Sequence, residues 1–298
     1  MTKSVTILQK FYAAFHKHGL TKICVLLLNY SLNYTRNFFR QLFYFYSFNS
    51  IVNRRRVHLG IEIAKKTNWI VLYGPLKSFR ISSNSVWGKA DVGAMLLGLY
   101  EREVQDILYK ESMNRSYFCE LGAADGFYGV GVVAAKLYQK SYCYETQRDA
   151  RDRLRKIAMI NQVSSSIKVL STADTNFYSY LQQDGVPFCQ LVILSDVEGG
   201  EYRIFSNETL KALSQAVLII EIHDWDGRSN DYLLLLERAS CYFVVSEHRT
   251  GSRNLNGITE LNGYADSDRW IICSEGRGDF GKFLYLRPKP EHILNHTL

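Results

Sequence analysis

An acid and two glycines stand together where an apolar run of this sequence gives way to a turn: Glu120, Gly122 and Gly126. Gly122 has no side chain, so the backbone can turn tightly there and a ligand can touch it. Gly126 opens a segment of helical pattern, whose first amides face the loop. About twenty residues further on, Glu145 ends a second apolar run, where an acid can accept hydrogen bonds from both hydroxyls of a ribose. The spacing therefore predicts a site for a nucleoside cofactor.

The turn favours S-adenosylmethionine over a nicotinamide dinucleotide. The dinucleotide fingerprint G-x-G-x-x-G needs a middle glycine so that the backbone can approach a pyrophosphate, and Ala124 stands at that position. S-adenosylmethionine has no pyrophosphate, and the carboxylate of Glu120 suits its ammonium group. An NAD-dependent oxidoreductase of a sugar and a non-catalytic nucleoside-binding module stay open as alternatives. We expect the cofactor to be held by Glu120, Gly122, Ala123, Ala124, Asp125, Gly126, Glu145, Asp174 and Asp196.

Two further stretches place polar side chains after apolar runs: Ser195-Asp-Val-Glu-Gly-Gly-Glu201 and Glu221-Ile-His-Asp224. Methyl transfer to an alcohol needs an aligned acceptor and a group that takes its proton. We predict His223 as the base, because its ordinary pKa lies near neutrality, and Asp196 beside the transferred methyl. Asp174 is expected to accept a hydrogen bond from the adenine amine.

The same residues are also a candidate metal site. Asp196, Glu221 and His223 offer two carboxylates and one imidazole, a donor set that suits Mg²⁺ or Mn²⁺ and could lower the pKa of an acceptor hydroxyl. The alternative is a structural role, since acids in the stretch Ser195–Glu201 would also stabilise the start of the helix that follows.

The elements that must position these residues alternate between strands and helices. Strands are predicted at 117–121, 141–145, 167–170, 189–194, 216–222, 241–247, 270–274 and 283–286, with helices at 126–139, 147–161, 177–183, 202–213 and 231–240. Such alternation predicts an α/β fold with a largely parallel sheet covered on both faces. The polar residues above end successive strands, and ligands gather at the carboxyl ends of parallel strands.

At this point the sequence resembles the FkbM-type branch of class I S-adenosylmethionine-dependent methyltransferases. The resemblance covers residues 115–250 and rests on Glu120–Gly126 with Tyr128, Asp196–Glu201 and Ile220–His223. Gly200 and Asp125 depart from the residues usual in the family. The resemblance implies a Rossmann-like seven-stranded sheet with an antiparallel last strand. It also implies methylation of a hydroxyl oxygen, often in polysaccharide biosynthesis, and hence a small-molecule, glycan or lipid-linked saccharide acceptor.

The first 110 residues differ in composition from the rest and are predicted to form a mainly helical, basic and aromatic extension to a methyltransferase domain at 111–298. They hold 16 Lys and Arg against 5 Asp and Glu, whereas residues 111–298 hold 20 against 24. Helices are expected at 5–20, 22–48 and 93–110, with short β pieces at 69–83. Interleaved basic and aromatic residues would suit contact with an anionic membrane surface, and no nucleic-acid motif accompanies them.

The cysteines and the N-terminal sequence indicate in which cellular compartment the protein is expected. The six cysteines form no C-x-x-C pair and are interpreted as small buried apolar residues in a reducing compartment. The N-terminus lacks the pattern of a secretory signal. We therefore predict a cytoplasmic protein, with peripheral contact at the inner face of the membrane as the variant that the basic extension suggests.

Overall fold

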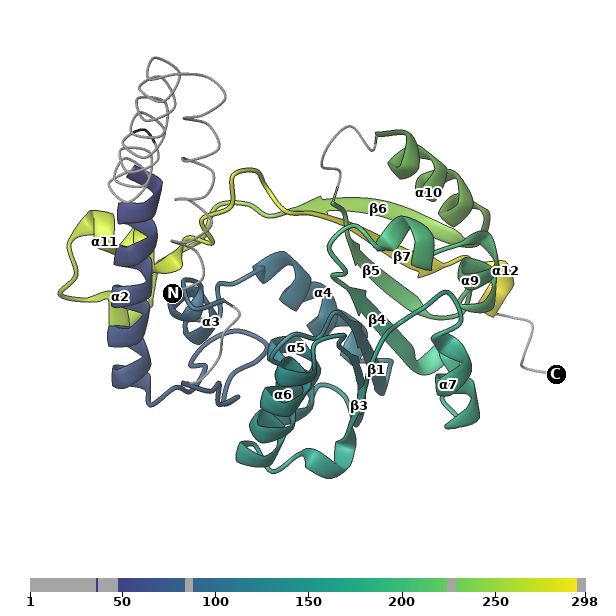
Figure 1. Cartoon of the computed structure of the whole chain (residues 1–298), viewed down its shortest axis with the longest axis horizontal. Coiled ribbons are helices and arrows are strands. Elements are labelled where there is room, and N and C mark those ends of the chain that lie inside the picture. Colours follow the sequence, from purple (N-terminus) through teal and green to yellow (C-terminus); the bar gives the residue numbers. More distant parts are fainter. Residues whose placement is uncertain (1–35, 37–47, 84–87, 224–228, 294–298) are drawn as a thin grey trace, which may run out of the picture. The chain divides into compact units, whose positions relative to one another are not determined.

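A seven-stranded mixed sheet forms the centre of the molecule in the computed structural model (Figure 1). The structure describes residue 36 and residues 48–83, 88–223 and 229–293. The strand order is β3-β2-β1-β4-β5-β7-β6. Strands β1 to β5 run parallel, and β7 lies antiparallel between β5 and β6. The predicted α/β class and the antiparallel last strand are confirmed.

The strands are short and mostly buried. They are β1 (Tyr117–Leu121), β2 (Lys140–Tyr144), β3 (Ile167–Leu170), β4 (Leu191–Ser195), β5 (Val217–Glu221), β6 (Phe243–Arg249) and β7 (Lys282–Pro288). In β1, β4 and β5 nearly every residue is buried. Burial on both faces is what a largely parallel sheet between two helical layers requires.

Alternate residues of the central strands belong to two separate cores. Phe118, Val192 and Ile219 pack on one face of the sheet, in a core that also holds Leu154 of α6. Their chain neighbours Cys119, Ile193 and Ile220 pack on the other face, in a core that includes helix residues such as Leu210 and Leu235. Successive side chains of a strand point to opposite faces, so the apolar runs of the sequence supply both cores at once.

Helices cover both faces, and Figure 1 shows α5 and α6 beside the β1–β3 side of the sheet and α10 beside β6. The helices are α2 (Phe48–Thr67), α3 (Val92–Leu96), α4 (Arg102–Ser112), α5 (Phe127–Ala134), α6 (Arg148–Ile160), α7 (Tyr178–Gln183), α8 (Glu201–Ile204), α9 (Asn207–Ala212), α10 (Ser229–Tyr242), α11 (Asp266–Cys273) and α12 (Pro290–Ile293). Within the described residues no helix is both long enough and apolar enough to cross a membrane.

Several predicted elements are corrected. The β piece predicted at 270–274 is wrong, because this stretch ends helix α11, which packs against α3. The single helices predicted at 93–110 and 202–213 are each divided in two. At the first break Glu101 has a left-handed backbone, which ends any helix that reaches it. The β pieces predicted at 69–83 reduce to one isolated bridge between Ile70 and Arg80.

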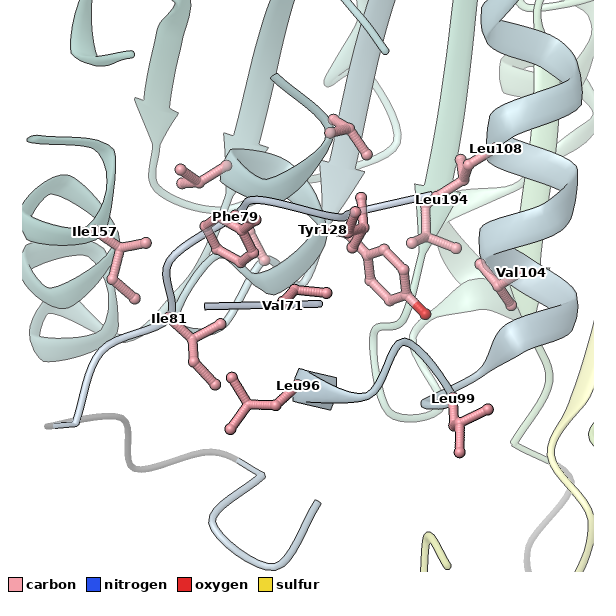
Figure 2. Packing of buried hydrophobic residues seen from close by; sticks show 14 of the residues in the cluster. Val71, Phe79, Ile81, Leu96, Leu99, Val104, Leu108, Tyr128, Ile157 and Leu194 are labelled. Carbon is pink, nitrogen blue, oxygen red and sulfur yellow. The ribbon is translucent and has the colours of Figure 1, made fainter. Parts of the chain in front are cut away.

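Described residues between 55 and 110 pack into the same apolar core as one face of the sheet. Figure 2 shows Val71, Phe79 and Leu96 of this region near Tyr128 of α5. Helix α4 adds Val104 and Leu108, both fully buried. The predicted domain boundary at residue 110 stays a prediction, as does the role of the extension. The predicted helices at 5–20 and 22–48 fall almost wholly outside the described residues.

Candidate functional site

A cavity of about 930 Å³ opens at the carboxyl ends of β1, β4 and β5. Parallel sheets bind their ligands at this edge. The β1 turn supplies one wall, and residues 275–281 supply the opposite one. Of the predicted site residues, the cavity is lined by Glu120, Gly122, Ala123, Ala124, Asp125, Asp196, Glu221 and His223, whereas Gly126, Glu145 and Asp174 are not among its lining residues.

In the turn after β1, position 122 can hold only glycine. Gly122 has φ +85°, and a Cβ there would lie 1.8 Å from the backbone oxygen of Asp196. The amide of Asp196 donates to the oxygen of Leu121, and the amides of Gly122 and Ala123 both donate to the oxygen of Tyr144. The ends of β1, β2 and β4 are thus tied together by backbone, and the turn's geometry follows from the absence of one side chain.

Two acids beside the turn are held by backbone amides. Glu120 accepts a hydrogen bond from the amide of Gly129 at 2.7 Å. Burial raises the pKa of Glu120 well above its ordinary value, and this amide opposes the rise. Glu145 accepts from the amides of Ala124 at 2.8 Å and Gln147 at 2.7 Å. Both carboxylates therefore fix the local backbone, and their predicted contacts with the cofactor's ammonium and ribose stay predictions.

The remaining cofactor candidates lie at different depths. Asp125 is buried and forms an ion pair with Arg153 of α6 at 2.6 Å. Asp174 is exposed in the loop after β3, where it accepts from the amide of Asn176 at 2.8 Å. Asp174 does not line the cavity, and its predicted contact with adenine stays a prediction.

The ends of β4 and β5 bring Asp196, Glu221 and His223 together. One donor atom from each residue lies within 4.8 Å of the others. The Nε2 atom of His223 lies 3.5 Å from Oδ1 of Asp196 and 3.6 Å from Oε2 of Glu198. Asp224, the neighbouring acid noted in the sequence, lies outside the described residues. The structure thus brings together the three residues that the sequence predicts as metal ligands.

A fourth carboxylate holds the other side of the imidazole. Glu201, the first residue of α8, is fully buried. Its Oε1 atom accepts from the backbone amide of His223 at 2.8 Å and lies 3.5 Å from Nδ1 of the ring. The two ring nitrogens of His223 therefore face carboxylates on opposite sides.

These carboxylates change the protonation of both catalytic candidates. Burial lowers the pKa of His223, but Glu201, Glu221 and Asp196 outweigh burial and raise this pKa to about 9. The pKa of Asp196 is raised by burial and by the carboxylates of Glu221 and Glu101. His223 is therefore protonated at neutral pH in the cofactor-free chain, which is not the state of a general base.

The opposite wall holds a guanidinium that sequence reasoning missed. Arg277 contacts Oε1 of Glu221 at 2.7 Å, Oε2 of Glu275 at 2.9 Å and a carboxylate oxygen of Glu101. All three acids are at least nine-tenths buried on their side chains. No spacing rule could have found this group, because Arg277 is 56 residues from Glu221 and 176 from Glu101.

Glu101 joins this network through an uncommon backbone conformation. Its φ is +41°, a region that non-glycine residues rarely adopt outside functional or tightly held positions. Its side chain also accepts from the hydroxyl of Tyr128 at 2.8 Å, and its amide donates to Glu275 at 3.0 Å. Burial and the carboxylate of Glu221 raise the pKa of Glu101 to about 8.

The wall that carries Arg277 separates two cavities. Residues 275–280 line the main cavity and also a second cavity of about 400 Å³, whose other lining residues include Thr250, Gly251 and Arg253. Arg253 anchors this wall from behind through Glu275 and through Glu103 at 2.7 Å. The neighbouring loop at 249–257 contributes only Arg249 to the main cavity.

Comparison with known proteins adds only distant likenesses. No family model matches the chain, and no curated protein matches it in sequence. Among solved structures it is similar to an O-methyltransferase from Bacillus cereus in complex with SAH (TM-score 0.43, 12% identity, 78% of this chain and 90% of that one). It is also similar to an rRNA methylase from Streptococcus thermophilus (TM-score 0.43, 10% identity, 63% and 98%). The Rossmann-like fold stands on the strand order described above, and the FkbM resemblance stays a prediction.

Proposed function

We propose that this chain is an S-adenosylmethionine-dependent methyltransferase that acts on a sugar hydroxyl of a glycan, polysaccharide or lipid-linked saccharide. The observation that carries the proposal is the turn at Gly122, which closes on the backbone of Asp196 at the mouth of the large cavity. A nucleoside cofactor that rests on this turn would have its reactive end beside Asp196 and His223.

Charge supports a cationic cofactor. The cavity lining holds the acids Asp91, Glu101, Glu120, Asp125, Asp196, Glu198, Glu221, Glu275 and Asp279, against Arg249, Arg277, Lys282 and His223. A sulfonium is favoured by an excess of carboxylates, whereas the pyrophosphate of a dinucleotide is opposed by it. Arginines pair with Asp125 and Glu275, and burial raises the pKa of Glu101 and Glu120. The charge argument therefore rests on the remaining acids and is secondary to the missing glycine.

The same charge balance supports a neutral acceptor. The guanidinium of Arg277 is neutralised by its three carboxylates, and the ammonium of Lys282 lies 4.1 Å from the ring centre of Tyr232. Carboxylates accept hydrogen bonds from hydroxyl groups, so a saccharide without phosphate or carboxylate groups fits this lining best. The proposal therefore does not include an anionic acceptor.

In the proposed reaction the protein aligns the acceptor oxygen with the methyl group and takes up its proton. The oxygen attacks the methyl carbon, the carbon–sulfur bond breaks, and S-adenosylhomocysteine leaves as a neutral thioether. Because the imidazole of His223 is protonated near neutrality, we assign the first acceptance of the hydroxyl proton to the carboxylate of Asp196. The imidazolium, 3.5 Å away, would orient that carboxylate and stabilise its charge.

Two measurements test the proposal. Calorimetry should detect S-adenosylhomocysteine and give no heat with NADH, and absence of S-adenosylhomocysteine binding would overturn the cofactor assignment. Transfer of a tritiated methyl group should then be compared between neutral methyl glycosides and the same sugars as phosphates or uronates. Faster transfer to the charged sugars would contradict the proposed acceptor class, and binding without transfer to any of them would favour the non-catalytic module.

A further inference from the structure

We propose that Asp196, Glu221 and His223 bind a divalent cation of the Mn²⁺ type, and that Glu201 is the buried carboxylate that orients His223 towards it. This inference rests on the proposed methyltransferase function only for the role that the bound ion would have in the reaction. The binding itself can be tested without a methyl acceptor, so the two claims can fail separately.

The donor geometry is the first support. The three donor atoms lie within 4.8 Å of one another, and Nε2 of His223 lies 3.5 Å from Oδ1 of Asp196. Carboxylate and imidazole ligands bind Mn²⁺ or Mg²⁺ at a little over 2 Å, so a small side-chain adjustment brings all three atoms onto one ion. The ligands come from the ends of two adjacent parallel strands, whose backbones are fixed by the sheet. The Oδ1 atom of Asp196 makes no hydrogen bond to any residue that the structure describes, so an acceptor oxygen is available to an ion.

The second support is the Glu201 carboxylate, which is not one of the three ligands and lies on the Nδ1 side of the His223 ring. A histidine that binds a metal through one ring nitrogen commonly directs the other at a carboxylate, which fixes the ring. Here Nε2 of His223 faces Asp196 and Nδ1 faces Glu201. Glu201 has no exposed surface, and its Oε2 atom lacks a hydrogen-bond partner among the described residues. A buried carboxylate so poorly satisfied is costly, and a cation on the far side of the imidazole would offset part of that cost.

The choice of ion follows from the donor set. Two carboxylates with one imidazole suit Mn²⁺, whereas sites made of oxygen alone favour Mg²⁺ or Ca²⁺ and sites with sulfur favour Zn²⁺. Arg277 contacts Glu221 only through Oε1, so this guanidinium does not engage the second oxygen of that carboxylate. Because a histidine binds a metal as the neutral imidazole, the bound ion would take the place of the imidazolium proton beside Asp196. It would act there as a Lewis acid on an oxygen of the acceptor.

The test is a titration of the full chain with Mn²⁺, followed by the paramagnetic resonance signal of the free ion. We expect one saturable site per chain in the wild type. Asp196→Asn should abolish it, and this variant should fold because the Asp196 side chain is 45% exposed. Glu201→Gln should weaken binding by about 10- to 100-fold, the usual effect of removing a carboxylate behind a histidine ligand. The matched controls Asp106→Asn and His58→Ala change exposed side chains and should leave binding unchanged.

Each outcome decides between specific and incidental binding. No saturable Mn²⁺ site in the wild type, or a site that survives Asp196→Asn, overturns the proposal. An unchanged affinity in Glu201→Gln overturns the orienting role proposed for Glu201. S-adenosylhomocysteine affinity is measured on the same samples. If the wild type does not bind S-adenosylhomocysteine, the proposed function fails. If the same wild type binds Mn²⁺ at one saturable site, the ion proposal still holds.

Discussion

The two walls of the main cavity are built in opposite ways. The β1 turn is a local structure, made by residues adjacent in the chain and held by backbone hydrogen bonds between neighbouring strands. The wall at 275–281 is held by side-chain ion pairs from distant elements, with Arg277 between Glu101, Glu221 and Glu275. A local backbone site keeps one fixed shape for one cofactor. A wall held by ion pairs can be changed by single substitutions, so the wall at 275–281 is the one that can vary.

The largest effect should come from adding one methyl group to the turn. We expect Gly122→Ala to abolish S-adenosylhomocysteine binding and to destabilise the fold by several kcal/mol, on the order of 3 or more, because the new Cβ collides with backbone. Gly263→Ala is the matched control, with φ +86° and nothing within 4 Å of the added Cβ; it should cost only about 1 kcal/mol. Urea unfolding measures both, and equal losses would show that the contact with Asp196 is unimportant.

The wall at 275–281 should respond differently. Arg277→Met leaves three buried carboxylates without their shared cation, which should reduce the free energy of unfolding by about 3 kcal/mol at pH 8. The loss should shrink as the pH falls through about 8, where Glu101 takes up a proton, and S-adenosylhomocysteine affinity should be retained. Arg102→Met is the control, since its pair with Asp106 is exposed and is worth well under about 1 kcal/mol. A pH-independent loss would argue against the ion pairs as the cause.

A third effect concerns the charge on His223. Its pKa is raised from 6.5 to about 9 in the folded chain, so the folded state holds this proton more tightly than the unfolded state. The stabilisation, on the order of 2 kcal/mol, is fully present below pH 6.5 and is lost as the pH rises through about 9. Unfolding free energies measured from pH 6 to 10 should fall less steeply in His223→Gln than in the wild type, and parallel curves would refute the assignment.

The smallest loss of stability should come from a substitution beside the β1 turn that leaves its backbone hydrogen bonds intact. Arg153→Gln removes one partner of Asp125, which has other interactions, so the expected loss is about 1 kcal/mol with little change in S-adenosylhomocysteine affinity. A large loss of affinity would show that this ion pair, and not the backbone alone, shapes the turn. Calorimetry on the same variant provides that comparison.

The contrast between the walls also explains what the sequence could predict. The strands, the turn and the acids that end β1, β2, β4 and β5 follow from local pattern, because apolar runs and glycine spacing are properties of neighbouring residues. Arg277 could not be found in this way, since its partners meet it only after the sheet has formed. Residues 270–273 were misassigned for a related reason: their apolar, β-branched side chains favour a strand, but packing of α11 against Gly93 of α3 decides for a helix.

The order of the strands has a consequence for how the chain is made. Strand β6 pairs only with β7 in the described sheet, and β7 follows it by more than thirty residues. During synthesis β1 to β5 can pair as they emerge, while β6 and the open side of β5 must wait for residues 282–288. Unpaired strand edges invite association with other chains. The wall at 275–281 directly precedes that late strand, so the turn after β1 can be complete on the ribosome before the second wall of the cavity has been made.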